Sequence, residues 1–184
     1  MLIEEVQKIV ATNVDSSTAY IRPAEVEYLW RICQGISNGL VIEIGTEHGM
    51  GSTFTMYQSL KGRNNRMICI DCWGGWSEVA KKQYYPRYQN YLKNLIVNDM
   101  TLSTIYDFSY RASELFVNSI ADIVFIDGSH LEEDVIRDIN CWKSKVKSGG
   151  VLCGHDYNME SVKRGVDPLF KNIELCASIW SVKI

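Results

Sequence analysis

The chain has 184 residues, of which 46% are hydrophobic and 22% are charged, and its formal net charge is −3. This size and composition are typical of one globular domain with a substantial core. A weakly acidic chain lacks the basic surface typical of nucleic-acid binding, so we expect no nucleic-acid partner. We also expect a cytoplasmic protein, because no apolar run is long enough to span a membrane and the first residues do not resemble a signal peptide.

Apolar residues recur along the chain at the spacing of helices and of buried strands in alternation. Helices are expected over residues 2–12, 23–36, 52–60, 77–98, 111–118, 129–148 and 162–170. Strands are expected over residues 40–44, 66–70, 101–107, 123–126, 151–153, 173–179 and 180–184. The alternation predicts an α/β fold with a doubly wound, mostly parallel sheet of seven strands. The last two strands have no helix between them, which predicts an antiparallel edge.

No repeat or linker interrupts the chain, so we expect a single domain with N-terminal helices in residues 1–37 and a core in 38–184. The helix at residues 1–11 and the edge strand at 180–184 are the segments that would pair with a second copy. A homodimer is therefore a hypothesis that the sequence leaves open.

The stretch from Ala121 to Tyr157 organises the rest of the chain. A buried strand ends at Asp127, and the spacing of Ser129 and Glu132 predicts a capping box at the start of an amphipathic helix. A glycine pair at 149–150 is expected to end that helix before a second buried strand. Parallel neighbours place their carboxyl ends on one edge of the sheet, where open α/β sheets bind ligands. We therefore expect four side chains to cluster there: Asp127, His130, His155 and Asp156.

The glycine-rich turn after the first core strand is a second candidate for ligand binding. Its glycines would let a ligand approach the backbone closely. Glu43 precedes the turn and is placed to accept hydrogen bonds from an ammonium group, whereas Asp71 ends the next strand, where an acid commonly binds the two ribose hydroxyls. Ser52 and Thr53 are placed to cap the following helix and reach a carboxylate. The alternative is that both acids only accept hydrogen bonds from turn amides.

The spacing of Gly45, Gly49 and Gly51 also occurs in short-chain dehydrogenases, which makes a nicotinamide-dependent oxidoreductase the competing interpretation. Those enzymes carry a Tyr-x-x-x-Lys pair late in the fold. Here that spacing occurs only at Tyr57 and Lys61, directly after the glycine turn, where it cannot meet a nicotinamide ring.

Five segments together resemble class I S-adenosylmethionine-dependent methyltransferases: Glu43–Thr46, Ile70–Trp73, Phe125–His130, Ser148–Val151 and Gly154–Tyr157. The subgroup is similar to methyltransferase domain family 24, which is related to macrolide-sugar O-methyltransferases. The resemblance covers roughly residues 25–184, in order. It implies a Rossmann-like domain that uses S-adenosylmethionine to methylate a hydroxyl of a small molecule, such as a sugar or secondary metabolite.

The resemblance also implies roles for individual residues. The cofactor would be bound by Glu43, Gly45, Thr46, Gly51, Ser52, Asp71, Cys72, Trp73, Ser109 and Asp127. The Asp71 carboxylate would take the ribose hydroxyls and Ser109 would lie on the adenine side. A divalent cation such as Mg²⁺ would be held by Asp127, His155 and Asp156, although relatives often have an acid in place of His155.

A neutral hydroxyl is a poor nucleophile, so it needs a base or a cation that lowers its pKa. His130 suits the base and Asp127 contributes to catalysis, since both occupy the positions of such groups in the resembled family. His48 is interpreted as a solvated turn residue. The tyrosines at 84, 85, 88 and 91 are either core packing or an aromatic wall for the acceptor. A binding module without turnover is the remaining alternative.

Overall fold

A computed structural model describes residues 1–13, 21–74 and 78–184, and side chains in residues 78–84 lie outside this description. Seven strands form one sheet in the order β3-β2-β1-β4-β5-β7-β6. The strands are β1 (Leu40–Ile44), β2 (Arg66–Asp71), β3 (Ser103–Tyr106), β4 (Ala121–Ile126), β5 (Val146–Gly154), β6 (Glu174–Cys176) and β7 (Ile179–Lys183). The first five are parallel, and β7 runs antiparallel to both of its neighbours. The predicted doubly wound fold is confirmed.

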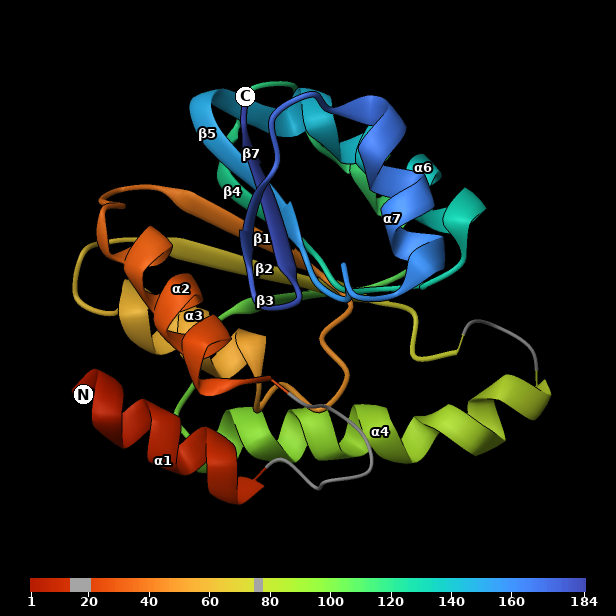
Figure 1. Ribbon diagram of the computed structural model, residues 1–184. Coiled ribbons are helices and arrows are strands. Elements are labelled where there is room, and N and C mark those ends of the chain that lie inside the picture. The colour runs from red at the N-terminus through yellow and green to blue at the C-terminus, as the bar shows by residue number, and fades with distance from the viewer. Residues whose placement is uncertain (14–20, 75–77) are drawn as a thin grey trace.

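Helices cover both faces of the sheet (Figure 1). They are α1 (Ile3–Asn13), α2 (Pro23–Gln34), α3 (Ser52–Leu60), α4 (Glu78–Val97), α5 (Ser109–Ala112), α6 (Glu132–Trp142) and α7 (Glu160–Val166). Short 3₁₀ turns follow at Ser113–Leu115, Lys143–Lys145 and Asp167–Leu169. None of the described helices is long and apolar enough to cross a membrane.

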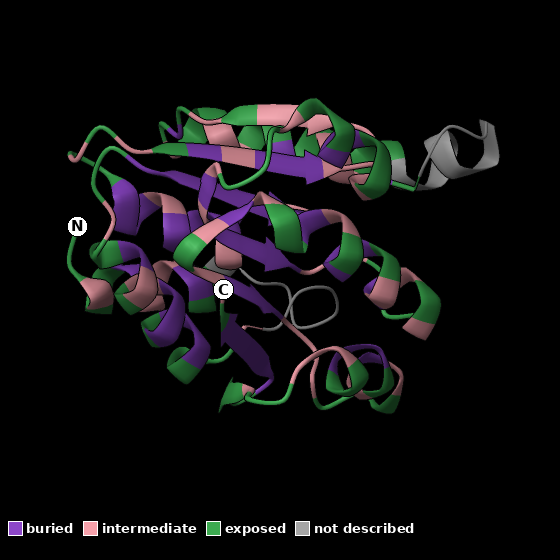
Figure 2. Ribbon diagram, turned by 90° about the horizontal axis from the view of Figure 1, so that it is seen from above, coloured by how far each residue is buried: buried purple, intermediate pink, exposed green. Residues whose placement is uncertain are grey.

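Alternate residues of β1 point to opposite faces of the sheet and join different parts of the core. Val41 packs with Leu29 of α2 and Met56 of α3, whereas Ile42 packs with Ile139 of α6 and Val162 of α7. The strands are buried on both faces, and the outer sides of the helices are exposed (Figure 2). Glu43 lies on the same face as Val41, which places its carboxyl group against the start of α3 rather than in solvent.

The predicted antiparallel C-terminal edge is confirmed, but the order of its two strands differs from the prediction. The segment expected at the edge forms β7, which inserts between β5 and β6. Residues 179–182 are buried, including Trp180, whereas Leu175 in β6 is 56% exposed. A five-residue apolar strand gains more from two neighbours than a three-residue strand does, so the edge falls to β6. Residues 179–181 therefore already have β6 as a partner and are not free to pair with a second copy.

Two predicted boundaries in the organising unit are also wrong. The Gly149-Gly150 pair does not precede β5 but lies within it, where the register shifts opposite Ala121 and Ile123. A Cβ on Gly150 would lie 2.8 Å from the carbonyl oxygen of Asp122, so this position needs glycine. At the start of α6, Leu131 is the N-cap and no capping box forms, because the Ser129 hydroxyl donates to Asp134 at 2.6 Å instead.

Candidate functional site

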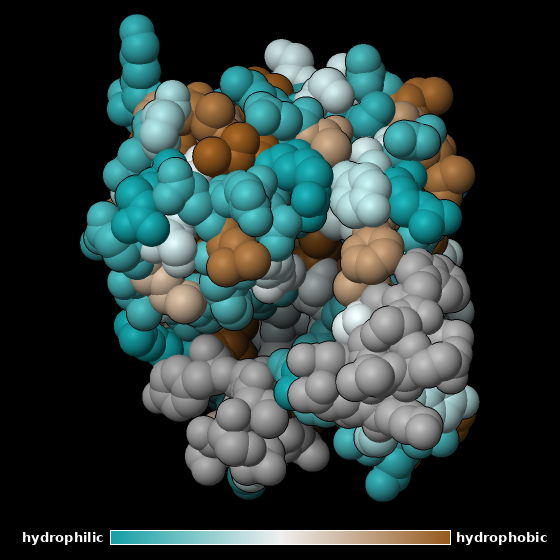
Figure 3. Space-filling model, turned by 90° about the vertical axis from the view of Figure 1, so that its right-hand side faces the viewer, coloured by the Kyte–Doolittle hydropathy of each residue, from teal (hydrophilic) through white to brown (hydrophobic). Residues whose placement is uncertain are grey.

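The carboxyl ends of the parallel strands surround one cavity of about 1110 Å³. Figure 3 looks onto this end of the sheet and shows a recess near the centre of the face. A typical small-molecule pocket has about 300–1,000 Å³, so this space can take two small ligands side by side. Most of the predicted site residues line this cavity: Gly45, Thr46, Gly51, Ser52, Asp71, Cys72, Trp73, Ser109, Asp127, His130, His155 and Asp156. Glu43 is fully buried behind this lining.

The glycine turn follows β1 and packs against the end of β4. Gly45 has a φ of 81°, and a Cβ there would lie 2.0 Å from the carbonyl oxygen of Asp127. Only glycine permits this backbone to pass so close to its neighbour. Beside it, the Thr46 hydroxyl is buried and has no hydrogen-bond partner among the described atoms. A buried polar atom of this kind at a cavity wall is suited to contact a ligand.

Among the described residues, Glu43 has only neutral hydrogen-bond partners. The Ser52 hydroxyl donates to its Oε1 at 2.6 Å, and the Cys69 sulfur lies 3.6 Å from Oε2. Burial without a cation disfavours the charged form, and it raises the pKa of Glu43 to about 8. A ligand ammonium group brought to this wall would supply the missing positive charge.

Asp71 holds the glycine turn in place. Its carboxylate accepts backbone N–H groups from Thr46 at 2.8 Å, Glu47 at 2.9 Å and Trp73 at 2.7 Å. A carboxylate offers about four acceptor positions, so roughly one is left for a ribose hydroxyl in this arrangement. Most of the contacts of Asp71 are therefore with backbone amides of the turns, as in the alternative interpretation.

Trp73 connects this turn to the tyrosine-rich helix α4. Its indole nitrogen donates to the Glu47 carbonyl at 2.9 Å, and its ring centroid lies 4.7 Å from that of Tyr88 and 5.0 Å from that of Tyr91. Tyr91 is fully buried, and neither tyrosine lines the cavity. These two rings pack in the core behind the wall, Tyr85 is largely exposed, and Tyr84 lies outside the described side chains.

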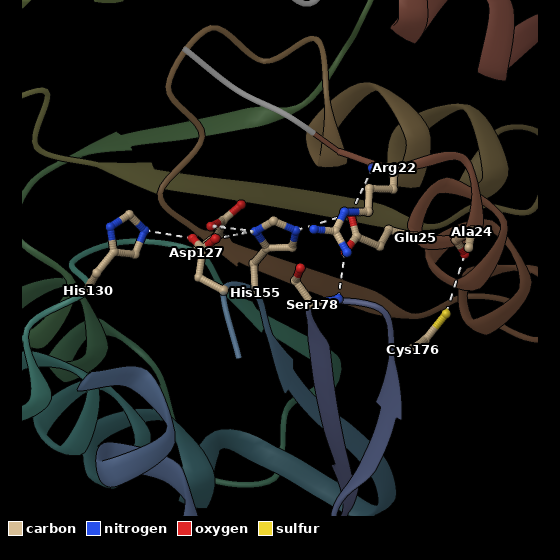
Figure 4. A network of polar contacts seen from close by, with 9 residues as sticks. Arg22, Ala24, Glu25, Asp127, His130, His155, Cys176 and Ser178 are labelled. Carbon is tan, nitrogen blue, oxygen red and sulfur yellow. Dashed lines mark hydrogen bonds and ion pairs between the residues drawn. The ribbon is translucent and has the colours of Figure 1, made fainter. Parts of the chain in front are cut away.

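Acids and histidines alternate across the ends of β4 and β5. His130 Nε2 lies 2.7 Å from Asp156 Oδ2, and His155 Nδ1 lies 3.2 Å from Asp156 Oδ1. The other nitrogen of His155 lies 3.3 Å from Oε2 of Glu25, a residue of α2. Asp127 is more loosely placed, with its Oδ1 3.8 Å from His155 Nδ1. Figure 4 shows His130, Asp127, His155 and Glu25 in a row.

The row is charged. Burial lowers the pKa of His155, but the carboxylates of Asp156 and Glu25 outweigh it and raise the pKa to about 10. Burial raises the pKa of Asp156, but its contacts with the two histidines hold that pKa well below its usual range. The hydrogen bond with Asp156 raises the pKa of His130. Burial raises the pKa of Asp127 to about 6. His155 is therefore an imidazolium between two carboxylates at neutral pH.

A cation site needs several donor atoms close together, and the residues that meet this condition differ from the predicted set. Among the described residues, Asp127, His130 and Asp156 each have one donor atom within 4.8 Å of the others. His155 was expected in place of His130, but its two ring nitrogens face Asp156 and Glu25. A ring held between two carboxylates as a cation is a poor ligand for a metal ion.

The predictions missed one acid on the other side of the cavity. Asp138 of α6 is 5% exposed, and its Oδ1 has no hydrogen-bond partner among the described atoms. Burial raises its pKa to about 6. It lies beside Ser109, whose hydroxyl accepts the indole N–H of Trp142 at 2.8 Å. The signal was present in the sequence, because Asp138 interrupts the apolar stripe of its helix between Val135 and Trp142.

Comparisons with known proteins match both the sequence and the fold. A family model described as a methyltransferase domain matches residues 42–157, well over half of the chain. The uncharacterized protein R132 of Acanthamoeba polyphaga mimivirus is 34% identical over 123 residues, which cover 63% of this chain and 50% of that protein. The chain thus spans about half the length of this curated relative.

Solved structures share the fold at low sequence identity. An S-adenosylmethionine-dependent O-methyltransferase from Thermotoga maritima has a TM-score of 0.67 at 11% identity, covering 97% of this chain and 71% of that one. A Podospora anserina methyltransferase bound to S-adenosylhomocysteine has a TM-score of 0.66 at 8% identity, covering 98% and 86%. A tRNA (m1A58) methyltransferase from Aquifex aeolicus has a TM-score of 0.63 at 14% identity, covering 92% and 62%.

Proposed function

The chain belongs to this family of S-adenosylmethionine-dependent methyltransferase domains, and we propose that its cavity directs methyl transfer to a hydroxyl group of a small acceptor molecule. One observation carries the choice of a hydroxyl: His130, a residue of the cavity wall, lies 2.7 Å from the Asp156 carboxylate. Such a pair is suited to remove a proton from a weak nucleophile. Acceptors that are already nucleophilic at neutral pH would not need it.

The residues of the glycine turn fit the cofactor. Gly45 lets the turn pack against the Asp127 backbone, and the Thr46 hydroxyl, which has no hydrogen-bond partner among the described atoms, lies in the cavity wall beside it. The buried Glu43 carboxyl group suits the positively charged amino group of the cofactor's methionine part. Asp71 and Trp73 would border its sugar. When bound, S-adenosylmethionine supplies an activated methyl group on a sulfonium sulfur, so the enzyme needs to contribute alignment and a competent nucleophile.

In this proposal His130 is the general base. Its Nε2–H donates to Asp156, so Nδ1 is the nitrogen that accepts the proton of the acceptor hydroxyl. As that proton moves to Nδ1, the acceptor oxygen bonds to the methyl carbon, and the carbon–sulfur bond breaks to leave a neutral thioether. Asp156 stabilises the imidazolium that forms. The base must be neutral to act, so activity should rise with pH as His130 loses its proton.

The substitution His130→Gln tests this role. We expect kcat to fall by about 10²–10⁴-fold, while the affinity for S-adenosylhomocysteine stays within about twofold, because a base contributes to the transition state and not to cofactor binding. His48→Gln is the matched control, since His48 also lines the cavity but makes no close contact with the Asp156 carboxylate. Equal activity of the two variants would remove His130 from the scheme.

A divalent cation such as Mg²⁺ is a second use of the same group of side chains. The nearby donor atoms of Asp127, His130 and Asp156 favour it, because they combine two carboxylates with an imidazole. A bound cation would lower the pKa of the acceptor hydroxyl and would occupy the histidine otherwise proposed as base. Activity that survives EDTA supports the base alone, whereas activity lost with EDTA and restored by Mg²⁺ supports the cation.

We propose a small acceptor in preference to a nucleic acid. The tRNA methyltransferase from Aquifex aeolicus shares only 14% identity, so its substrate does not transfer with its fold. The net charge of −3 disfavours a phosphate backbone. Incubation with labelled S-adenosylmethionine should methylate hydroxylated small molecules and leave tRNA unlabelled. Binding of NADPH in place of S-adenosylhomocysteine would favour the oxidoreductase interpretation, and binding without any transfer would favour a non-catalytic module.

A further inference from the structure

Glu25 of α2 is an acid that the cofactor and the proposed base do not explain. It lies outside the residues matched by the family model, and its side chain is 0% exposed. An acid at this third position of a helix often reaches back to the N-cap, and Glu25 does accept the backbone N–H of Arg22 at 2.7 Å. Such a cap needs no burial and only one of the two carboxylate oxygens. Capping of α2 therefore does not explain the burial of Glu25 or its other contacts.

These contacts reach both neighbours of Asp156 in the chain. On one side, Glu25 Oε2 lies 3.3 Å from Nε2 of His155, as an ion pair whose geometry is not that of a hydrogen bond. On the other side, Glu25 Oε1 accepts the backbone N–H of Ser178 at 2.7 Å, and the Ser178 carbonyl accepts the N–H of Tyr157 at 2.9 Å. One carboxylate thus fixes the residue before and the residue after Asp156.

Asp156 needs this support because of its backbone. Its φ is 58°, in the left-handed region that costs a residue with a side chain roughly 1–2 kcal/mol. Such a conformation persists only when its surroundings determine it. It turns the carboxylate so that Oδ1 meets His155 and Oδ2 meets His130.

We propose that Glu25 is a positioning residue that acts through His155 and Ser178 to hold Asp156 against His130. This inference rests on the proposed function, since it concerns the same histidine. Glu25 does not line the cavity, so the proposal gives α2 an indirect part in the reaction. Without the carboxylate, the buried His155 ring would lose its ion-pair partner on the Nε2 side, and the ring would be free to turn away from Asp156.

Kinetics of the complete chain test the proposal. Glu25→Gln keeps the size of the side chain and an oxygen for one backbone N–H but loses the charge. We expect kcat to fall by about 10–100-fold with an unchanged KM for S-adenosylmethionine. His155→Gln should give a similar loss, and the double variant should lose no more than the larger single loss, because both changes break one chain of contacts.

Val26→Ala is the matched control, because Val26 is the buried neighbour of Glu25 on α2 and packs in another cluster. It should lower thermal stability and leave kcat at the level of the unmodified protein. Multiplicative losses in the double variant would overturn the proposal, as would a normal kcat in His155→Gln, which is informative even if Glu25→Gln fails to fold.

A second readout does not depend on turnover. The chain has three histidines, so a protein labelled with ¹⁵N in its histidine rings gives three sets of ring signals, which substitution of His48 and His155 assigns. Glu25→Gln should shift the signals of His155 and His130 and leave those of His48 unchanged. Unshifted His130 signals would contradict the positioning role. If no acceptor is ever methylated but these shifts occur, the proposed function fails and the positioning of His130 stands.

Discussion

At the end of β1, the carboxyl group of Glu43 is buried with only neutral partners, whereas at the end of β5 Asp156 lies between two histidines. The pKa of Glu43 is raised to about 8, and that of Asp156 is held well below its usual range. Glu43 lies near the end of one apolar strand and Asp156 just after another strand of the same sheet, so the difference comes from their partners and not from the strands.

The comparison indicates a division of labour across the cavity. On the β1 side, the buried Glu43 has no cationic partner among the described residues, which suits a ligand that brings a positive charge with it. The side formed by β4 and β5 carries its own cations, which suits groups that must keep a fixed orientation while a proton moves. The following predictions would break or sharpen this distinction.

The largest loss of stability is expected at Gly45, where the turn after β1 packs against the end of β4. Gly45→Ala should destabilise the protein by more than about 3 kcal/mol and abolish cofactor binding, because the new Cβ would lie 2.0 Å from the Asp127 carbonyl oxygen. Gly62 has the same φ of 81° but open space around its Cα, so Gly62→Ala should cost only about 1–2 kcal/mol. Equal losses in chemical denaturation would mean that backbone conformation alone, and not the contact, requires glycine at position 45.

The second prediction contrasts the two acids. Asp156→Asn should cost about 3 kcal/mol of unfolding free energy, because it leaves the buried His155 charge without one of its carboxylates. Glu43→Gln should cost less than about 1 kcal/mol at pH 7, since the buried acid is already largely neutral there. The same change should weaken binding of S-adenosylhomocysteine at least about tenfold. Denaturation curves paired with calorimetry separate the two outcomes, and a reversed order of stabilities would reject the assigned charges.

The third prediction concerns pH. The pKa of His155 is raised to about 10 from an ordinary value of about 6.5, so its charge stabilises the fold fully below pH 6.5, and this contribution is lost as the pH rises through 10. The difference in unfolding free energy between the unmodified protein and His155→Gln should shrink by on the order of 4 kcal/mol between pH 6.5 and 10. A difference that is constant over this range would show that His155 is neutral.

The smallest effect is expected at the opposite ends of the strands. Lys147 Nζ lies 2.8 Å from Asp122 Oδ2 and is well exposed to solvent. Lys147→Met should change the unfolding free energy by less than about 1 kcal/mol, because exposed ion pairs contribute little. The Asp122 carboxylate keeps the backbone N–H of Leu40 as a partner at 2.8 Å. A loss of unfolding free energy as large as that of Asp156→Asn would contradict the distinction between buried cavity residues and exposed ion pairs.

Local periodicity was enough to predict the alternation of strands and helices and the edge of the sheet where Asp127, His130, His155 and Asp156 gather. The order β5-β7-β6 was not predictable, because it depends on which of two adjacent strands gains more from burial. The partner of His155 was missed for a similar reason. Glu25 is separated from it by 130 positions, and only the packing of α2 against the turn before β7 brings the two together.

Asp138 was missed although its helix was predicted, because a single acid within an apolar stripe was not weighed as a cavity residue. Two further expectations remain predictions: a cytoplasmic location and a homodimer. For the homodimer, the sequence offered α1 and a C-terminal edge strand, and residues 179–181 of that strand already pair with β6.

Calorimetric titration with S-adenosylhomocysteine in two buffers of different ionisation enthalpy tests the central claim most directly. The account predicts binding with micromolar affinity and release of a fraction of a proton at pH 7, because the ligand's ammonium group favours the charged form of Glu43. The release should disappear in Glu43→Gln. No binding, together with binding of NADPH, would contradict the account.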